Sequence, residues 1–409
     1  MSPLRGLLDV LRRFVIRGCA ALAPACAGSP LRGFLWLLLL GTIPLVGCNA
    51  QNNRSEQTAQ ETLIVEPPTE YTLDENIGMM LLVGFRGTEV DSLQNPDIVS
   101  ALRDYHVGSV ILFDYDVPTG TRGRNIKDAA QLKQLCRQLR SFKPDLLIGI
   151  DQEGGYVSRL STRYGFPAIP SAQKCAAKGV DTVRHYAALT GRMLEEIGIN
   201  LDFAPVADVN VNPRCPVIGG IERSFSGDPA VVRRCCMIWS EELLNHHVVS
   251  CWKHFPGHGS ATGDTHKGLV DVTGTWKPCE LDPYRDMPEG HAMVMTAHVI
   301  NRQLDPSGLP ASLSPTMTSL LRDTLHFQGV IVTDDLAMGA IVQQYSFEQA
   351  VRMAVLAGAD LLCLSNNGGT YDVNMVPRTV KVIRQMVADG TVSADRIAQS
   401  ASRIRSLKP

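Results

Sequence analysis

The chain has 409 residues, of which 44% are apolar and 20% are charged. This composition supports a large hydrophobic core and excludes a disordered chain, a collagen-like repeat or a small disulfide-stapled scaffold. The 39 lysines and arginines are balanced by 41 acidic residues, so the net charge is -2 and no nucleic acid is expected as a partner.

The first predicted element is an export signal at the N-terminus. Residues 1–33 contain five arginines and one acid, and the apolar run FLWLLLLGTIPL follows at 34–45. A helix of this length would span only about 18 Å, short of the roughly 30 Å hydrocarbon core of a bilayer. We therefore predict a signal peptide over residues 1–47 instead of a stable transmembrane helix.

The signal ends in Leu45-Val46-Gly47-Cys48, which resembles a bacterial lipobox. In that interpretation Cys48 is lipidated, becomes the new N-terminus and anchors the protein to a membrane of the cell envelope. The alternative is an ordinary signal peptide with an incidental cysteine. Residues 48–69 are mostly polar and include a Pro-Pro pair, which suits a tether between a lipid anchor and a folded domain over 70–409.

Eight of the 11 cysteines would remain in the folded domain after signal removal and acylation of Cys48. They form no Cys-x-x-Cys pair, so zinc-ribbon and thioredoxin chemistry are not predicted. We expect most of them to be buried as small apolar side chains. An oxidising compartment would permit a disulfide, but the sequence selects no pairing.

From about residue 70 onward, short apolar strands alternate with helices. The helical patterns lie at 181–197, 229–246 and 347–357. The strand candidates are nearly continuous in apolar residues, as in a parallel sheet buried on both faces. Seven are visible and an eighth is not: 107–113, 146–151, 201–206, 248–255, 292–299, 329–335 and 359–364.

This alternation fits either a (β/α)8 TIM barrel in a single catalytic domain or a doubly wound sheet. No glycine-rich phosphate loop follows a strand, so the doubly wound nucleotide-binding sheet is not supported. In a barrel, the carboxyl ends of the strands converge on one mouth, where active sites are built. We predict the barrel because polar residues follow strand after strand: Asp151-Gln152-Glu153, Asp208, Lys253-His254, His298, Asp334-Asp335 and Ser365-Asn366.

The run KHFPGHGSATGDTH, from Lys253 to His266, is the most informative segment. Its proline and three glycines exclude a regular helix, so we expect a shaped loop that leaves a strand. In such a loop the carboxylate of Asp264 can hold one imidazole nitrogen of His266 and leave the other free. The sequence therefore predicts a dyad for general acid and base catalysis.

A metal centre is the competing interpretation of the same region. Candidate ligands would lie near one barrel mouth, whereas isolated histidines such as His258 and His298 are more often structural. We favour the dyad and expect neither a metal nor a cofactor. The candidate ligands are His254, His258, Asp264, His266 and His298.

A further predicted strand ends in Thr333-Asp334-Asp335. Successive side chains of a strand face opposite ways, so only one of the two acids can point into the mouth. We expect Asp334 to be the functional acid and Asp335 to cap a helix that begins at Leu336.

The segment IDQEGGYVSRL places Asp151 at a strand end and Arg159 eight residues later. An acid and an arginine in a barrel mouth suit bidentate hydrogen bonds to sugar hydroxyls or to a carboxylate.

Six motifs in this order and spacing resemble glycoside hydrolase family 3, in its β-N-acetylhexosaminidase (NagZ-type) branch. The resemblance covers about residues 72–405. It implies a (β/α)8 barrel, no metal and retaining hydrolysis of terminal β-linked N-acetylglucosamine, typically from muropeptides of peptidoglycan. The motifs are IDQEGGYVSRL, LDFAPVADVN, IERSFSGDP, KHFPGHGSATGDTH, PASLSP and VIVTDDLAMGA.

The resemblance also implies roles for individual residues. Asp334 is expected to be the nucleophile that forms a covalent glycosyl-enzyme, and His266 the acid/base, oriented by Asp264. The sequence departs from the family pattern at Tyr156, Glu222 and Thr265, and the first two leave the preferred leaving group open. Five residues are expected to hold the sugar: Asp151, Arg159, Arg223, Lys253 and His254.

Three alternatives remain beside an exported, monomeric hydrolase. A histidine acid/base adds no second anion that would repel phosphate, so phosphorolysis of the same glycosides is one. A non-catalytic sugar-binding lipoprotein and a metallohydrolase are the others. Members of this branch are often cytoplasmic, which is the alternative to a location in the periplasm or cell envelope.

Overall fold

The computed structural model describes residues 71–285, 287 and 292–407. The predicted signal peptide, Cys48 and the predicted tether therefore lie outside the described residues. Within the described ranges, no helix is both long enough and apolar enough to cross a membrane.

Eight parallel strands form the centre of the fold. Their order in the sheet follows the chain from β1 to β13, and β14 pairs with β1. A parallel bridge between Val332 and Leu361 joins β13 to the residue before β14 and closes the ring. This arrangement confirms the predicted (β/α)8 barrel. The strands are β1 (Leu81–Gly84), β2 (Ser109–Leu112), β5 (Leu147–Ile150), β8 (Leu201–Asp202), β9 (Val249–Phe255), β11 (Ala292–Thr296), β13 (Ile331–Thr333) and β14 (Leu362–Leu364).

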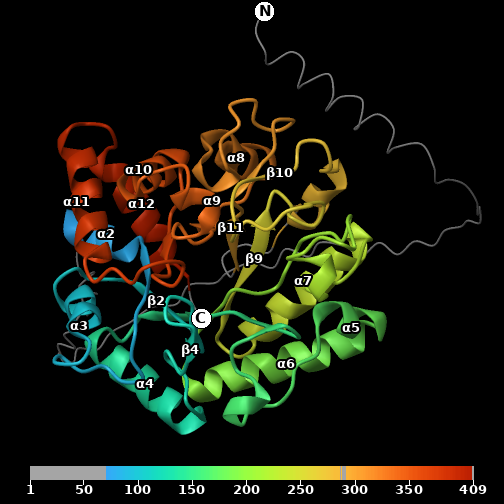
Figure 1. The fold of residues 1–409 in the computed structure, drawn as a ribbon, viewed down its shortest axis with the longest axis horizontal. Coiled ribbons are helices and arrows are strands. Elements are labelled where there is room, and N and C mark those ends of the chain that lie inside the picture. The colour runs from blue at the N-terminus through green and yellow to red at the C-terminus, as the bar shows by residue number, and fades with distance from the viewer. Residues whose placement is uncertain (1–70, 286, 288–291, 408–409) are drawn as a thin grey trace, which may run out of the picture. The chain divides into compact units, whose positions relative to one another are not determined.

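Helices lie around the outside of these strands, and the chain colour progresses around the ring (Figure 1). Local sequence fixes several of their ends: the Ser346 side chain caps the start of α10, and Gly198 ends α6 in a left-handed conformation with φ 95°. The α-helices are α2 (Leu73–Met79), α3 (Pro96–Arg103), α4 (Ala129–Phe142), α5 (Ala172–Ala177), α6 (Val180–Ile197), α7 (Pro229–Leu244), α8 (Pro315–Ser319), α9 (Gly339–Val342), α10 (Phe347–Ala357), α11 (Met375–Ala388) and α12 (Ala394–Arg405).

All seven predicted strands are present, and the eighth is β1. It was not visible in the sequence because α2 ends at Met79 and β1 begins at Leu81, so no polar turn separates them. The apolar residues of helix and strand merge into one run, in which neither period stands out.

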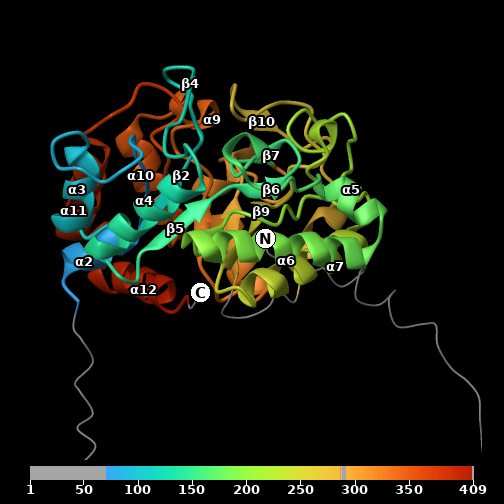
Figure 2. The same ribbon diagram turned by 90° about the horizontal axis from the view of Figure 1, so that it is seen from below.

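The loops that leave the strands carry short strand pairs on one side of the barrel. Figure 2 shows β4, β6, β7, β10 and α9 on that side, with α2 and α12 on the other. The pairs are β3 (Tyr115–Asp116) with β4 (Thr121–Arg122), β6 (Gln152–Gly154) with β7 (Val157–Ser158), and β10 (Val270–Asp271) with β12 (Val299–Ile300).

Short 3-10 and π turns complete the connections: η1 (Thr162–Tyr164), η2 (Gly219–Ile221), η3 (Pro278–Tyr284), η4 (Ala311–Leu313) and the π turn η5 (Leu320–Thr324). The eight cysteines of the described residues are all free, and all but the partly exposed Cys279 are buried. Most cysteines therefore do pack as small apolar side chains, as expected.

Candidate active site

Lys253, on β9, is the centre of a buried ion-pair cluster at the barrel mouth. Its Nζ lies 2.8 Å from Asp151 Oδ1 and 2.7 Å from Glu153 Oε1. Arg223 donates from Nε and Nη2 to the two oxygens of Glu153, both at 2.8 Å. Arg159 Nη2 lies 3.4 Å from Asp151 Oδ2. Opposite charges thus hold side chains from three separate segments in one network.

The charges of this cluster stabilise one another. Burial alone would raise the pKa of Glu153, but Arg223 and Lys253 lower it to about 2. Burial opposes the ionisation of Asp151 in the same way, and Lys253 and Arg159 nevertheless hold its pKa below the usual value. Burial would lower the pKa of Lys253, which its two carboxylate partners raise instead. The cluster therefore stays charged at neutral pH.

Asp208 fixes His254 and the start of the glycine-rich loop. Its Oδ2 lies 2.6 Å from His254 Nδ1, and its Oδ1 accepts the backbone N–H of His258 at 2.7 Å. Because a carboxylate only accepts, Nδ1 of His254 carries the proton. The other ring nitrogen, Nε2, lies 3.4 Å from Arg223 Nη2, so His254 joins the ion-pair cluster.

Asp264 and His266 form the contact that their spacing predicts. Asp264 Oδ1 lies 2.8 Å from His266 Nδ1 and also accepts the backbone N–H of His266 at 2.9 Å. Burial would raise the pKa of Asp264, but these two hydrogen bonds hold it below its usual value. His266 lines a cavity of about 290 Å³ together with Asp151 and Arg159. The free Nε2 is the nitrogen available for proton transfer.

The loop that carries the dyad docks on the segment that follows β13. The backbone N–H of Ala340 donates to the carbonyl oxygen of Thr265 at 3.1 Å. Next to it, a Cβ added to Gly339 would lie 2.4 Å from the carbonyl oxygen of His266. The absence of a side chain at Gly339 thus permits close contact between the dyad loop and α9.

Asp334 and Asp335 make different contacts. Burial would raise the pKa of Asp334, but the imidazoles of His298, His254 and His266 and the backbone N–H of Asp335 hold it below its usual value. Asp335 accepts from both the backbone and the hydroxyl of Ser365, and burial raises its pKa.

The expected helix at Leu336 is wrong, since α9 begins only at Gly339. Asp335 instead accepts the backbone N–H of Ala337 in a turn and binds the segment after β14 through Ser365. Of the two acids, Asp335 also lines the 290 Å³ cavity, and their different partners distinguish them.

The structure brings the five predicted sugar-holding residues into one network, and two of them, Asp151 and Arg159, line the same cavity as His266. The sequence alone assigns no role to Glu153 and Asp208, although both follow predicted strands. The feature of the sequence that could have identified them is an acid at the end of a strand. Such an acid needs a cation or several N–H donors when it is buried.

Of the two remaining candidate ligands, His298 uses both ring nitrogens for structure, whereas His258 bonds only through Nε2, at 3.2 Å to Thr265 Oγ1, and its buried Nδ1 has no hydrogen-bond partner. His298 has Nδ1 2.6 Å from Ser312 Oγ and Nε2 2.8 Å from the carbonyl oxygen of Asp335. Burial lowers the pKa of His258 to about 4. Among the described residues, no group of three or more His, Cys, Asp and Glu side chains is placed to hold a metal ion.

Comparison with known proteins places this barrel among glycosidases. The model of the glycosyl hydrolase family 3 N terminal domain matches residues 72–407. A beta-hexosaminidase from Neisseria meningitidis serogroup C is 34% identical over 285 residues, which are 66% of this chain and 74% of that protein. Beta-hexosaminidase LpqI from Mycobacterium tuberculosis is 30% identical over 351 residues, which are 82% of each chain.

Solved structures agree with this match. A family 3 β-N-acetylglucosaminidase from Paenibacillus sp. str. FPU-7 has a TM-score of 0.74 and 33% identity, over 82% of this chain and 62% of that one. The β-N-acetylhexosaminidase from Beutenbergia cavernae has a TM-score of 0.71 and 27% identity, over 82% of this chain and 98% of that one. This chain thus spans less than two thirds of the Paenibacillus enzyme. From its match over 72–407, the chain belongs to glycosyl hydrolase family 3.

Proposed function

We propose that this protein is a retaining β-N-acetylglucosaminidase that removes terminal β-linked N-acetylglucosamine from peptidoglycan fragments. The family and the activities named for its relatives support the class of reaction. One observation carries the mechanism: the Asp264–His266 pair faces the cavity that Asp151 and Arg159 also line. Asp334 lies close enough for the His254 and His266 imidazoles to lower its pKa.

In the first step, the carboxylate of Asp334 attacks the anomeric carbon and forms a covalent glycosyl-enzyme. His266 donates its Nε2 proton to the leaving oxygen as the glycosidic bond breaks. In the second step, the same nitrogen takes a proton from water, which attacks the anomeric carbon and releases Asp334. Because an imidazole can donate and accept a proton near neutral pH, it serves both steps without a second anion beside the nucleophile.

The ion-pair cluster binds the sugar. Asp151 and the Nε2 of His254 accept from sugar hydroxyls, whereas Arg159, Arg223 and Lys253 offer donors to hydroxyl and acetamido oxygens. Since their charges are already paired and buried, these groups need little rearrangement when the sugar replaces water.

We also propose that the enzyme is exported and held at the cell envelope by a lipid on Cys48. The lipobox-like run before Cys48 and the polar residues after it support this location. Cys48→Ser should move the protein from the membrane fraction to the soluble fraction after cell lysis. Membrane association that survives this substitution would contradict the lipid anchor.

Chromophore release from an aryl β-N-acetylglucosaminide tests the reaction. The wild-type protein should turn over this substrate, and Asp334→Asn should lose nearly all turnover while its thermal unfolding stays close to that of the wild type. His266→Ala should lose about 10²- to 10⁴-fold on a disaccharide with a poor leaving group, and far less on the aryl glycoside.

Three outcomes of this assay would reject parts of the proposal. Wild-type turnover in folded Asp334→Asn would reject the nucleophile, and equal losses of His266→Ala on both substrates would reject the acid/base. A sugar 1-phosphate formed when phosphate is added would identify a phosphorylase. Absence of turnover in the folded wild type would favour a sugar-binding lipoprotein.

A further inference from the structure

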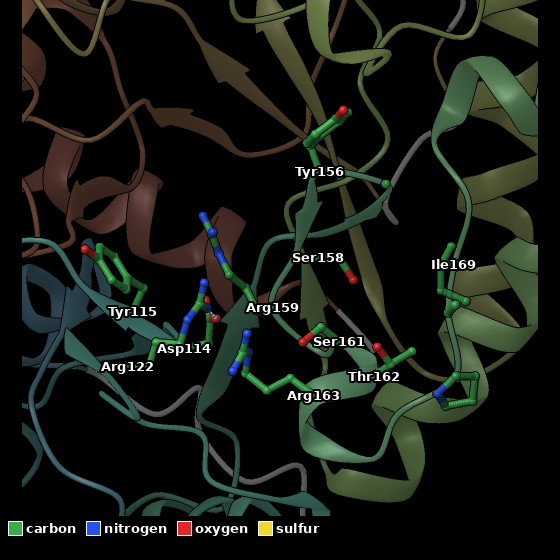
Figure 3. A pocket seen from close by; sticks show the side chains of 13 residues that line it. Asp114, Tyr115, Arg122, Tyr156, Ser158, Arg159, Ser161, Thr162, Arg163 and Ile169 are labelled. Atoms are coloured by element: carbon green, nitrogen blue, oxygen red, sulfur yellow. Dashed lines mark hydrogen bonds and ion pairs between the residues drawn. The ribbon is translucent and has the colours of Figure 1, made fainter. Parts of the chain in front are cut away.

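The 290 Å³ cavity of the candidate active site has two walls of different origin. Tyr115 on β3 and Arg159 just after β7 belong to one wall, and Figure 3 shows both side chains on the segments that carry them. The segment after β13 forms another wall through Asp335 and Met338. The proposed nucleophile, Asp334, directly precedes this second wall, so the position of its carboxylate depends on how the segment is held.

Hydrogen bonds fix the backbone at Asp334 and one oxygen of its carboxylate. The backbone N–H of Asp334 donates to the carbonyl oxygen of Thr296 on β11 at 2.9 Å. Its Oδ1 accepts the backbone N–H of Asp335 at 2.8 Å. Within the described residues, Oδ2 of Asp334 makes no hydrogen bond. One carboxylate oxygen is therefore held by the chain, and the other is free to attack the anomeric carbon.

His298 holds the carbonyl group of Asp335. This histidine follows β11 by two residues and is fully buried. Its Nε2 lies 2.8 Å from the carbonyl oxygen of Asp335, and its Nδ1 lies 2.6 Å from Ser312 Oγ. Because a carbonyl oxygen only accepts, Nε2 carries the proton, and Nδ1 of the neutral ring accepts from the hydroxyl. The Ser312 hydroxyl thus favours the ring form that can bind Asp335.

Ser312 belongs to the PASLSP motif, which the two-step mechanism does not use. The backbone N–H of Ser312 donates to the carbonyl oxygen of Ala297 at 3.0 Å. An antiparallel bridge also joins Pro310 to Ile300. The motif is therefore docked on both sides of His298, which fixes the direction of the Ser312 hydroxyl.

We propose that His298 and Ser312 are positioning residues of the nucleophile. The Ser312 hydroxyl sets the ring form of His298, and the ring N–H holds the Asp335 carbonyl. The backbone N–H of Asp335, on the other side of the same α-carbon, then keeps Oδ1 of Asp334 in place, so that Oδ2 faces the anomeric carbon. This inference rests on the proposed function, since it takes Asp334 as the nucleophile.

Single-turnover release of chromophore from an aryl β-N-acetylglucosaminide, with enzyme in excess, measures the attack by Asp334. His298→Leu removes the ring N–H and should lower this rate about 10²-fold, as expected for a misplaced reacting group. The inhibition constant of N-acetylglucosamine should stay within about twofold, because the ion-pair cluster is unchanged. Unlike the loss in His266→Ala, the loss in His298→Leu should be equal for an aryl glycoside and a disaccharide, because every leaving group needs the nucleophile.

Two further variants distinguish the hydrogen bond from packing. His298→Gln keeps a side-chain N–H for the Asp335 carbonyl and should restore the rate to within about tenfold of the wild type. Ser312→Ala lets the imidazole adopt either ring form and should lower the rate about tenfold. Ser240→Ala is the matched control, because Ser240 Oγ is also buried and accepts from Trp252 Nε1 at 2.7 Å. It should lower thermal stability and leave the single-turnover rate unchanged.

The outcomes separate failure of this inference from failure of the proposed function. A wild-type single-turnover rate in folded His298→Leu or Ser312→Ala would overturn the positioning role alone. A rise in the inhibition constant of N-acetylglucosamine as large as the loss in rate would overturn it too, since the defect would then lie in sugar binding. If His298→Leu did not fold, Ser312→Ala would decide, because it removes a single oxygen atom. Wild-type turnover in folded Asp334→Asn would reject the nucleophile, and with it the proposed function.

Discussion

The two halves of the candidate site are held in different ways. In the ion-pair cluster, Lys253 is 3% exposed and each charge has a partner fixed at the end of a barrel strand. In the dyad, His266 is 66% exposed and depends on Asp264 and on loop contacts with α9. The barrel therefore preorganises the groups proposed to bind the sugar, whereas the proton-transfer group lies on an exposed part of a loop, outside the barrel strands, and is held by Asp264 and by the contacts of its loop with α9.

The boundary between these two halves of the site lies within one loop, the one that follows β9. At Gly259 an added Cβ would lie 1.8 Å from the carbonyl oxygen of Val209, so this part of the loop is packed tightly against the barrel. Residues 257–261 are buried, whereas Thr262, His266 and Lys267 are exposed. The KHFPGHG run thus belongs to the rigid half, and the dyad that follows it belongs to the adjustable half.

The largest expected effect comes from removing the central charge of the rigid half. Lys253→Met leaves Asp151 and Glu153 buried beside each other with fewer counter-charges. We expect the free energy of unfolding to fall by about 3–5 kcal/mol, as for other broken buried ion pairs. Urea unfolding, followed by the fluorescence of the buried Trp239 and Trp252, measures the loss.

An exposed ion pair provides the control for this prediction. Arg184 on α6 lies 3.1 Å from Glu241 on α7, also pairs with Glu242, and is 47% exposed. Arg184→Met should change the free energy of unfolding by less than about 1 kcal/mol. Similar losses for Lys253→Met and Arg184→Met would mean that the cluster is no more rigid than the surface.

Glu280 offers a smaller, pH-dependent test of the rigid part of the loop. This buried acid of η3 accepts the backbone N–H groups of Ser260 and Lys277. Burial nevertheless raises its pKa to about 7, above the unfolded value of 4.5. A raised carboxyl pKa stabilises the fold below the unfolded pKa, and that stabilisation is lost as the pH rises toward 7.

The measurement compares wild type with Glu280→Gln, which cannot ionise. The free energy of unfolding of the variant, minus that of the wild type, should increase by up to about 3 kcal/mol between pH 4.5 and pH 8. Glu196→Gln, at an exposed position on α6, serves as the control and should give a flat difference. If the difference for Glu280→Gln were also independent of pH, ionisation of Glu280 would not reduce the free energy of unfolding.

The same contrast explains what the sequence could predict. Strand ends such as Asp151 and Lys253 were identified because barrel geometry brings all of them to one mouth. The Asp264–His266 contact was predicted because its two residues are local. The pairings of Glu153 with Arg223 and of Asp208 with His254 join segments 70 and 46 residues apart, and residue spacing contains no information about such contacts.

The last prediction, with the smallest effect, concerns the adjustable half. A Cβ at Gly339 would lie 2.4 Å from the carbonyl oxygen of His266, so Gly339→Ala must displace the dyad loop or α9. A shift of His266 should slow proton donation more than sugar binding, because the ion-pair cluster is not in contact with Gly339. We expect kcat to fall about tenfold for a disaccharide, equal to about 1.4 kcal/mol, with a smaller loss for an aryl glycoside.

Gly274→Ala is the matched control, since a Cβ there meets no atom within 4 Å. If Gly339→Ala instead raised KM equally for both substrates, the loop would position the sugar as well as the proton, and the two halves of the site would not be independent.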